Sequence, residues 1–402
     1  MYPRQQAVAR LKQLTQLIRN YSSARLCENK ENLILDIQKQ QEVFPLVWLR
    51  DNCKCTSCFH EHSTSRIIKW IKFDTSPKVS TIEITNDNNL VLQWHDKHIS
   101  KFSIDWLKER SFREDSQQKY LQENYRPARI PWSQETFDAA RKVYEYEDIM
   151  KNDHALYNWL VDFARYGMVF TRNAPNDNHA AAKVANRIAF IRKTHYVEEF
   201  EVRHTPGTSN VAYLSGSLQL HTDLPYYEYV PGAIILHCLV QTDGEGGDSL
   251  LSDGLYHAEK LRQENKEAFD LLSSVEVNWL DIGSEHGDKY HTIFRCPVIR
   301  LDLQGNIDKI HYSVPQRDSH FTVDVKHVKP WYEALKLFVN SITHGTSKLK
   351  LQPGELLAVD NVRLLHGRTS YQDSDKTERY LKGVYIDWDE LFSKMRVLKS
   401  QK

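Results

Sequence analysis

The segment LQLHTDLPYYEY, residues 218–229, places His221 two positions before Asp223. On a β-strand, side chains at positions i and i+2 emerge from the same face, so these two could bind one metal ion. A second histidine, His366, follows another apolar run in VDNVRLLHGRTSY. Two histidines and one carboxylate form the facial triad of non-haem Fe(II) sites, which leaves the other coordination positions open. By itself the HxD pattern is weak, because a solvated pair at a strand end is the more common arrangement.

Further polar groups lie downstream of this pair. The turn GGDSLL spans residues 246–251, and Arg368 and Arg379 both follow His366. An oxygenase that uses 2-oxoglutarate needs a cation for the distal carboxylate of that cosubstrate, and the fork of an arginine binds a carboxylate with two hydrogen bonds. The two arginines are therefore candidates for this role.

Three of the six cysteines, Cys53, Cys55 and Cys58, fall within the segment DNCKCTSC. Such clustering is typical of a metal site in a reducing compartment, whereas a secreted disulfide framework spreads its cysteines. Three thiolates and one histidine satisfy tetrahedral zinc, and a site without an open position is structural. Reduced buried cysteines are the alternative, and a catalytic thiol is disfavoured because no basic partner accompanies the cluster in a recognisable motif. The nearby histidines that could complete the site are His60, His62, His95 and His98.

The overall composition excludes several classes of protein. The chain has 402 residues, and its 53 basic and 53 acidic side chains give a formal net charge of zero. Proteins that bind nucleic acid or membrane surfaces normally show a basic excess. No run approaches the ~18 apolar residues that a membrane span needs. We therefore expect neither nucleic acid as a partner nor membrane insertion.

Residues 1–29 differ in composition from the rest of the chain. They carry several basic residues, no acid before Glu28, and apolar residues at roughly helical spacing. An arginine-rich, acid-poor and amphipathic start is typical of a transit peptide. We interpret the segment as a transit peptide or basic leader, which predicts a mitochondrial location. A basic surface helix of a cytoplasmic protein is the alternative.

The element pattern predicts two domains. A small β-rich domain over residues 30–125 is indicated by short apolar runs between polar turns. The charged, proline-containing stretch REDSQQKYLQENYRPARIPW leads into a linker placed at residues 126–150. The strands expected in the first domain are residues 33–37, 43–51, 66–73, 80–85 and 89–96.

The second domain is placed at residues 151–402. It begins with an amphipathic helix that runs into a strand, with Gly167 as the helix stop. Strands that outnumber helices suggest a barrel or double sheet with helices packed outside. The expected strands are residues 232–242, 248–253, 297–305, 308–314 and 354–361, and the expected helices are residues 254–275 and 329–345.

Several motifs in order resemble one known family. HTD, PG…LHC…Q, GGDS, DN-RLLHGR-SY and R-L-G-Y-DWD are similar to the γ-butyrobetaine and trimethyllysine dioxygenase family, from PLVWLRDNCKCTSC to RVLK. The resemblance implies a mainly β fold with flanking helices (α+β), built from a double-stranded β-helix (jelly-roll) catalytic domain and a small zinc-binding N-terminal domain. It also implies hydroxylation of γ-butyrobetaine to L-carnitine, with Fe(II), 2-oxoglutarate as cosubstrate and ascorbate as reductant. A homodimer is expected on the same ground.

The resemblance also implies roles for individual residues. The iron ligands would be His221, Asp223 and His366, and Arg379 would bind 2-oxoglutarate with help from Arg368, Ser249 and the backbone at Leu236. His98 would be the fourth zinc ligand beside the three cysteines.

A trimethylammonium group cannot donate a hydrogen bond, so aromatic faces must recognise it through cation–π attraction. The aromatic cage of the family corresponds to Tyr196, Phe200, Tyr213 and Tyr385, and Asn210 to a contact with the polar end of the substrate. Two positions depart from the γ-butyrobetaine enzyme: Leu224 replaces a tyrosine, and Ser313 replaces an asparagine. Contacts of this kind separate substrates that differ by one polar group.

Three other functions therefore stay open. Trimethyllysine dioxygenase is favoured by the leader but opposed by the complete cysteine cluster. A paralogue that hydroxylates another trimethylammonium substrate would explain Leu224 and Ser313. A catalytically silent, zinc-dependent interaction protein is disfavoured, because it would not need the triad together with Arg379.

Overall fold

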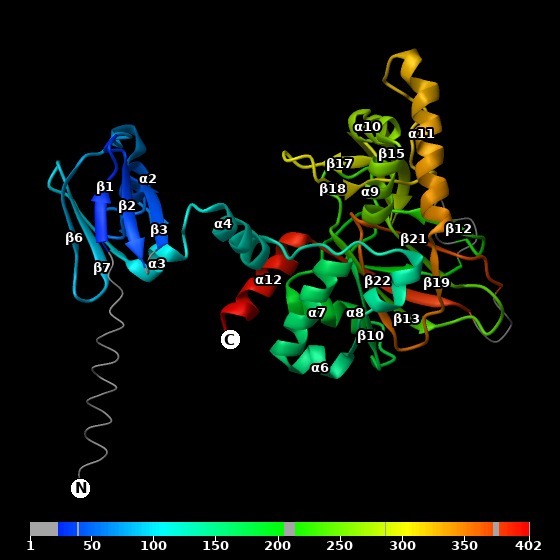
Figure 1. Cartoon of the computed structure of the whole chain (residues 1–402). Coiled ribbons are helices and arrows are strands. Elements are labelled where there is room, and N and C mark those ends of the chain that lie inside the picture. Colours follow the sequence, from blue (N-terminus) through cyan, green and yellow to red (C-terminus); the bar gives the residue numbers. More distant parts are fainter. Residues whose placement is uncertain (1–22, 38–39, 205–213, 286, 373–377, 402) are drawn as a thin grey trace, which may run out of the picture. The chain divides into compact units, whose positions relative to one another are not determined.

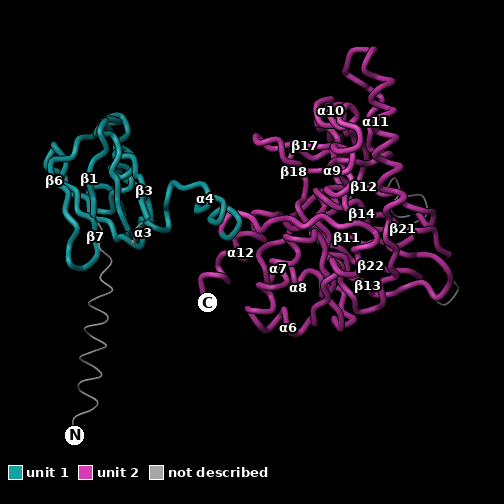
Figure 2. Tube along the Cα trace, in the orientation of Figure 1, with its two compact units in different colours: residues 1–123 teal, residues 124–402 magenta. Residues whose placement is uncertain are grey.

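The computed structural model describes residues 23–37, 40–204, 214–285, 287–372 and 378–401. The chain divides into two compact units, unit 1 of residues 1–123 and unit 2 of residues 124–402 (Figures 1 and 2). Strand β1 (Ser23–Leu26) already belongs to a sheet of unit 1. This sheet therefore begins inside the segment that the composition assigns to a leader.

Unit 1 contains two three-stranded antiparallel sheets, with the orders β1-β2-β3 and β6-β7-β8. Buried and less buried positions alternate along β2 and β7, as expected of strands with one face on a core. The core includes Leu33, Leu35, Phe44, Leu92 and Trp94. The elements are β2 (Asn32–Ile37), β3 (Gln40–Pro45), β6 (Val79–Ile84), β7 (Asn89–Trp94), β8 (Ile99–Ser103), α3 (Ile104–Lys108) and α4 (Glu114–Tyr120).

Two expected strands of unit 1 are wrong. The run 43–51 continues only to Pro45 as β3 and then forms the helix α2 (Leu46–Asp51), because Leu46 and Leu49 are buried at helical spacing. The run 66–73 forms only the end of a short hairpin, β4 (Phe59–His60) with β5 (Ser65–Arg66), and a 3-10 turn at Trp70–Lys72. Its apolar side chains find no sheet face to cover, and Ile71 is 96% exposed.

The larger sheet of unit 2 has the order β11-β22-β13-β20-β10-β9, and the smaller has the order β12-β21-β14-β19. Buried side chains from both sheets, such as Phe170, Leu357 and Leu364, belong to one core cluster, so the sheets pack together. The strands are β9 (Val143–Glu145), β10 (Met168–Arg172), β11 (Glu199–Val202), β12 (Leu218–His221), β13 (Ala233–Val240), β14 (Ser249–Asp253), β19 (Ser347–Leu349), β20 (Leu356–Asp360), β21 (Leu364–Arg368) and β22 (Tyr380–Ile386).

Helices of unit 2 pack on the larger sheet, as Figure 1 shows for α7 and α8. The predicted transition at Gly167 is confirmed: α7 (Asp153–Tyr166) ends there at φ 75°, and β10 follows at once. Glycine adopts this left-handed backbone without the penalty that a Cβ would bring. The other helices on this side are α6 (Tyr146–Lys151), α8 (Ala180–Ile188) and α12 (Trp388–Ser400).

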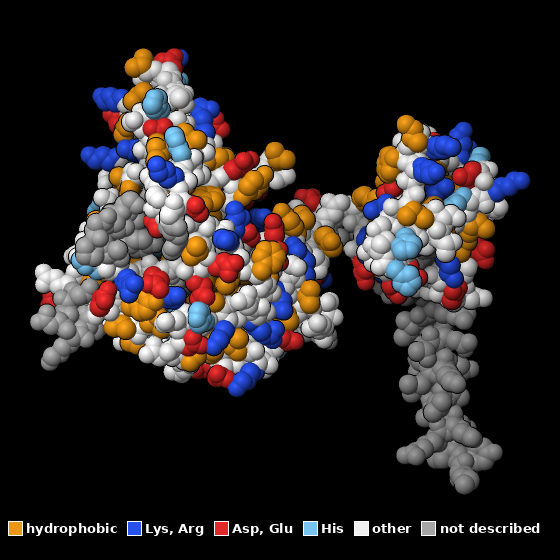
Figure 3. Space-filling view, turned by 180° about the vertical axis from the view of Figure 1, so that it is seen from behind, with side chains coloured by type: hydrophobic (Ala, Val, Ile, Leu, Met, Phe, Trp, Pro, Cys, Tyr) orange, Lys and Arg blue, Asp and Glu red, His pale blue; other side chains and the backbone are white. Residues whose placement is uncertain are grey.

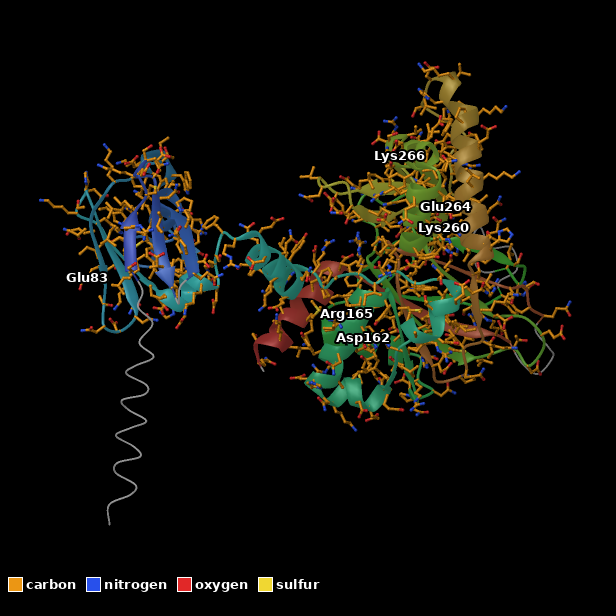
Figure 4. All side chains as sticks on the ribbon, viewed as in Figure 1. Glu83, Asp162, Arg165, Lys260, Glu264 and Lys266 are labelled. Atoms are coloured by element: carbon orange, nitrogen blue, oxygen red, sulfur yellow. The ribbon has the colours of Figure 1, made fainter. Side chains whose placement is uncertain are left out.

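The single helix expected over residues 254–275 is instead two helices, α9 (Gly254–Glu264) and α10 (Lys266–Ser274). Asn265 separates them, because its side chain accepts a hydrogen bond from the backbone N–H of Ala268 and so caps α10. Figure 4 labels Glu264 and Lys266 on either side of the break. The neighbouring elements are a hairpin of β15 (Val277–Glu285) with β16 (Asp288–Cys296), then β17 (Ile299–Leu301), β18 (Ile307–Ile310) and α11 (Val325–His344).

Acidic and basic side chains are interspersed over unit 2 on the face that Figure 3 shows, in keeping with the zero net charge. Among the described residues, no helix is both long enough and apolar enough to cross a membrane.

A buried ion pair joins distant parts of unit 2. Arg363, with a side chain 1% exposed, donates to both carboxylate oxygens of Asp253, at 3.0 and 2.7 Å. The same guanidinium donates to the carbonyl oxygens of Ile130 and Arg165, and the backbone N–H of Trp132 donates to Asp253. The pair therefore connects the segment before α7, the end of α7, and strands β14 and β21.

Replacing Arg363 with alanine is expected to lower the free energy of unfolding by about 3–5 kcal/mol, because it leaves the Asp253 charge buried without its partner. Urea unfolding monitored by tryptophan fluorescence measures the change. The control is Lys101→Ala, which breaks an exposed pair with Asp87 and should leave the free energy of unfolding nearly unchanged. Equal effects of the two substitutions would contradict the prediction.

Candidate active site

Two neighbouring strands bring the triad together. Strands β12 and β21 run antiparallel, and His221 lies directly opposite His366, with ring centroids 4.4 Å apart. Asp223 follows the end of β12, and its Oδ1 lies 3.1 Å from His221 Nε2 and 3.5 Å from His366 Nε2. Adjacent ligands of an octahedral ion with bonds of about 2.1 Å are about 3 Å apart. The three side chains therefore fit one metal ion.

Other side chains orient these groups. The Nδ1 atom of His221 lies 2.8 Å from the carbonyl oxygen of Gln219, which leaves Nε2 on the side of Asp223. The hydroxyl of Tyr385 donates to Asp223 Oδ2 at 2.8 Å, so that Oδ1 remains turned toward the histidines. Hydrogen bonds from neighbouring groups to the metal ligands fix the geometry of those ligands and are a regular feature of metal sites.

The electrostatics of the triad suit a cation. Burial by itself raises the pKa of Asp223, but the charge of His366 and hydrogen bonds from both histidines outweigh burial, so the pKa lies far below its usual range. Burial lowers the pKa of His366, and the charge of His221 lowers it further. Burial also opposes protonation of His221, yet the hydrogen bond and charge of Asp223 leave its pKa raised. A metal ion that binds these three side chains therefore competes with protons for the histidine nitrogens.

The triad lies on the wall of a cavity of about 420 Å³, which has room for a small molecule. Most residues predicted for the cosubstrate and the substrate line the same cavity: Tyr196, Phe200, Leu236, Ser249, Arg368, Arg379 and Tyr385. The remaining two, Asn210 and Tyr213, lie outside the described residues.

The two arginines differ in their surroundings. Both are buried, with exposed fractions of 4% for Arg368 and 3% for Arg379. The guanidinium of Arg368 donates to the carbonyl oxygens of Leu214 and Gly216 and so positions the cavity wall before β12. Arg379 lies next to the start of β22, with its guanidinium 5.4 Å from the ring centroid of Tyr371. A buried cation on the wall of a cavity with a metal site fits a dicarboxylate cosubstrate.

A glycine allows the aromatic wall to form. Phe200 on β11 lies opposite Gly383 on β22 and stacks on Tyr385 with ring centroids 4.7 Å apart. A Cβ added at Gly383 would lie 2.2 Å from the ring of Phe200, so only glycine leaves room for it. Tyr196, which is 8% exposed, is a further aromatic residue of the cavity wall.

Both departures from the family pattern lie on the cavity wall. Leu224 is buried there and has a backbone φ of 55°, a left-handed conformation that is uncommon for leucine. Ser313 is 1% exposed, and its hydroxyl donates to the side-chain oxygen of Gln316. The substitutions therefore change the chemistry of the cavity itself.

Sequence reasoning missed several residues around the triad. Tyr226 and Gln316 line the cavity, and Asn361 hydrogen-bonds the backbone of Asp223. Thr222 exchanges hydrogen bonds with the backbone of Tyr312. The available signal was the position of Asn361 within VDNVRLLHGR, directly before the strand that carries His366.

In unit 1 the side chains of the three cysteines meet His98. Its Nε2 atom lies 3.2 Å from Cys53 Sγ and 3.7 Å from both Cys55 Sγ and Cys58 Sγ. A tetrahedral zinc ion with bonds of about 2.0–2.3 Å separates its ligands by about 3.3–3.8 Å. The cluster is therefore compatible with zinc, whereas His60, one of the competing histidines, lies 2.7 Å from the hydroxyl of Ser63.

Comparison with known proteins agrees with this description. Residues 117–385 match the family described as taurine catabolism dioxygenase TauD, TfdA. Residues 24–108 match the family described as gamma-butyrobetaine hydroxylase-like, N-terminal. Among solved structures, an asparagine oxygenase in complex with Fe(II), 3-hydroxyasparagine and succinate covers 60% of this chain and 83% of its own, at 19% identity and a TM-score of 0.45.

Three relatives span nearly the whole chain. The gamma-butyrobetaine dioxygenase of Homo sapiens is 34% identical over 92% of this chain and 94% of its own. The gamma-butyrobetaine dioxygenase of a Pseudomonas species is 32% identical over 89% of this chain and 90% of its own. The mitochondrial trimethyllysine dioxygenase of Homo sapiens is 30% identical over 89% of this chain and 83% of its own.

These matches confirm the predicted mainly β jelly-roll with flanking helices, and the β-rich N-terminal domain with its cysteine cluster. The chain therefore belongs to the TauD, TfdA family, among its gamma-butyrobetaine hydroxylase-like members, and is an Fe(II)- and 2-oxoglutarate-dependent dioxygenase.

Proposed function

We propose that this protein hydroxylates γ-butyrobetaine to L-carnitine. The observation that carries the proposal is one cavity that combines His221, Asp223 and His366 with a buried arginine and an aromatic wall. The gamma-butyrobetaine dioxygenases of two organisms, each matched over about nine-tenths of the chain, support this substrate. The complete cysteine cluster points to the same branch of the family.

Fe(II) with 2-oxoglutarate and O2 supplies the oxidising power, so that one oxygen atom enters a C–H bond and the other enters succinate, with release of CO2. In our proposal His221, Asp223 and His366 hold the iron, with ascorbate as the external reductant. Arg379 binds the distal carboxylate of 2-oxoglutarate, with Ser249 and the backbone of Leu236 beside it on the cavity wall. The protein thus aims a substrate C–H bond at the metal and excludes water.

The substrate's trimethylammonium group would contact aromatic faces, because it offers no hydrogen-bond donor. Tyr196, Phe200 and Tyr385 line the cavity and support this assignment. Tyr213 and Asn210 complete the proposed substrate site. Since Phe200 already stacks on Tyr385, the cation would bind against the remaining faces and edges of these rings.

A different trimethylammonium substrate is the second candidate, and a specific observation favours it. Leu224 and Ser313, which depart from the γ-butyrobetaine pattern, both lie on the cavity wall. A leucine cannot hydrogen-bond a substrate carboxylate, and a serine hydroxyl reaches less far than an asparagine amide. Trimethyllysine and other betaines are therefore the alternatives to test.

The test measures succinate formed by the purified protein with Fe(II), 2-oxoglutarate and ascorbate, in the presence of γ-butyrobetaine, trimethyllysine or neither. We expect γ-butyrobetaine to stimulate turnover and to yield carnitine. Stimulation by trimethyllysine alone would identify the protein as a trimethyllysine dioxygenase instead. If neither compound stimulates turnover while iron and 2-oxoglutarate bind, Leu224 and Ser313 have redirected the cavity to another substrate.

We also propose the domain organisation and location. The proposed order is a leader, a zinc-binding domain over residues 30–125, a linker over residues 126–150 and a catalytic domain over residues 151–402. The boundary between the two units, after residue 123, lies close to the end of the proposed zinc-binding domain, whereas β9 and α6 within the proposed linker belong to unit 2. Strand β1, which starts at Ser23, argues for a leader shorter than residues 1–29. A mitochondrial location is supported by the name of the trimethyllysine relatives. A homodimer stays a prediction.

The role of Arg379 can be tested by kinetics. Replacing it with methionine should raise the KM for 2-oxoglutarate by about 10–100-fold, because a hydrogen-bonded charge contributes about 1.5–3 kcal/mol. Arg379→Lys retains the charge but not the fork, and should fall between the methionine variant and the unchanged protein. The KM is measured from succinate formation at varied 2-oxoglutarate. An unchanged KM in the methionine variant would assign the cosubstrate to another cation.

A further inference from the structure

Asn361 is a fully buried amide between strands β20 and β21, and it is 0% exposed. Its side-chain oxygen accepts a hydrogen bond from the backbone N–H of Asp223 at 2.7 Å. Its side-chain nitrogen donates to the carbonyl oxygen of Asp223 at 2.9 Å and to that of Pro231 at 3.0 Å. One side chain therefore holds both polar backbone groups of a single residue, and that residue belongs to the triad.

The backbone after Asp223 needs such support. Leu224 has a φ of 55°, in the left-handed region where a Cβ clashes with the backbone. Leucine has no side-chain group that could stabilise this conformation locally, unlike asparagine or aspartate. Residues in such conformations persist only where the surrounding structure enforces them, and they gather at functional sites. The hydrogen bonds of Asn361 lie directly beside this turn.

The left-handed turn lies directly beside the carboxylate of Asp223. If Leu224 relaxed to an extended or helical backbone, the direction of the chain after it would change, and the backbone groups of Asp223 that Asn361 holds would shift with it. The carboxylate itself also accepts a hydrogen bond from Tyr385 at Oδ2. In the observed conformation Oδ1 lies within 3.5 Å of both histidine Nε2 atoms. The left-handed turn and the metal-binding geometry thus occur together.

We propose that Asn361 is a positioning residue for the metal site, which clamps the backbone of Asp223 and thereby maintains the left-handed turn at Leu224. The inference rests on the proposed role of Asp223 as a metal ligand. It does not depend on which substrate the enzyme uses, because the clamp acts on the metal site before any substrate binds. Asn361 touches neither iron nor substrate in this scheme and acts through Asp223.

The test uses Mn(II) as the probe, with zinc left in place. Mn(II) prefers nitrogen and oxygen ligands over thiolates, so it reports on the triad and not on the cysteine cluster. Its dissociation constant is measured by electron paramagnetic resonance of free Mn(II), at a temperature at which every variant is folded. Asn361→Ala should weaken Mn(II) binding by about 10–100-fold, the usual loss when a partner of a metal ligand is removed.

Two further variants separate positioning from a general loss of stability. Asn278 is also a buried asparagine, 8% exposed, whose amide donates to the carbonyl oxygen of His320. It is not among the residues that line the cavity, so Asn278→Ala should leave the Mn(II) dissociation constant within about twofold. Adding Leu224→Gly to Asn361→Ala should recover much of the affinity, because glycine adopts the left-handed turn without a clamp.

The outcomes are distinct. Weakened binding in Asn361→Ala, with recovery in the double variant, supports the proposal. Affinity unchanged in Asn361→Ala, or lowered equally in Asn278→Ala, overturns it, as does a double variant no better than Asn361→Ala. Asp223→Ala identifies the cause of a failure. If that variant binds Mn(II) as tightly as the unchanged protein, the proposed iron site itself is wrong; if it loses Mn(II) while Asn361→Ala does not, only the clamp is wrong.

Discussion

Replacing His366 with alanine is expected to abolish stimulated turnover of 2-oxoglutarate, with a loss greater than about 100-fold. Removal of a residue that merely supports a metal ligand costs about 10–100-fold in affinity or activity, and removal of a ligand itself should cost more. His366 lies directly opposite His221 on the neighbouring strand, and its side chain is 13% exposed on the cavity wall. Succinate formation and iron content are measured together.

His257 offers a matched control for this substitution. It is also a buried histidine, on α9, whose Nδ1 atom lies 2.8 Å from the hydroxyl of Ser341. Burial lowers the pKa of His257 to about 4, so its imidazole is neutral at pH 7. Replacing it therefore removes a packed histidine ring, as His366→Ala does, without removing a proposed metal ligand. His257→Ala should lower stability yet retain stoichiometric iron. Full activity in His366→Ala, or equal loss of iron in both variants, would contradict the assignment of His366 to the triad.

Replacing Cys58 with serine is expected to release zinc and to unfold the segment around the cysteine cluster. Structural zinc contributes about 10–16 kcal/mol to the folding of small zinc-binding peptides at neutral pH, and this free energy depends on a complete ligand set. Burial raises the pKa of Cys58 to about 11, so without a metal its thiol stays protonated and contributes no charge to the cluster. Zinc content is measured by elemental analysis, and local opening by hydrogen exchange over residues 46–66.

Cys27 provides the control for this experiment. It is a free cysteine of unit 1 that lies outside the cluster, where it contacts the side chain of Asn29. Cys27→Ser should keep one equivalent of zinc and the exchange protection of the unchanged protein. If Cys58→Ser also keeps its zinc and its protection, the three cysteines and His98 do not form a structural metal site.

Much of the chemistry of the two sites could be predicted from the sequence alone, because the patterns that indicate it are local. The HxD pair suggested two ligands on one face through the two-residue period of a strand, although β12 ends at His221 and Asp223 lies just beyond it. The cysteine cluster lies within six residues of the chain, from Cys53 to Cys58, and its spacing already suits a metal. The helix that stops at Gly167 was equally predictable, since a glycine at that position follows an amphipathic run.

Local signals failed where burial against a distant part of the chain decides the structure. The run 66–73 has the apolar content of a strand, but no sheet face covers it, and Ile71 stays exposed. The run 254–275 has continuous helical periodicity, yet the cap at Asn265 allows a second helix to start in a new direction. In both cases the pattern is compatible with two structures, and tertiary packing selects one.

The sequence by itself determined which reactive groups are present: two histidines and an aspartate, an arginine downstream of the second histidine, and a cluster of thiols. What only the tertiary structure decided was their mutual geometry. The pairing of His221 with His366, the pair Arg363–Asp253 and the clamp of Asn361 on Asp223 each join residues more than a hundred positions apart. The physical reason is that strand register and buried hydrogen bonds between distant segments follow from the packing of the whole domain, which no short stretch of sequence specifies.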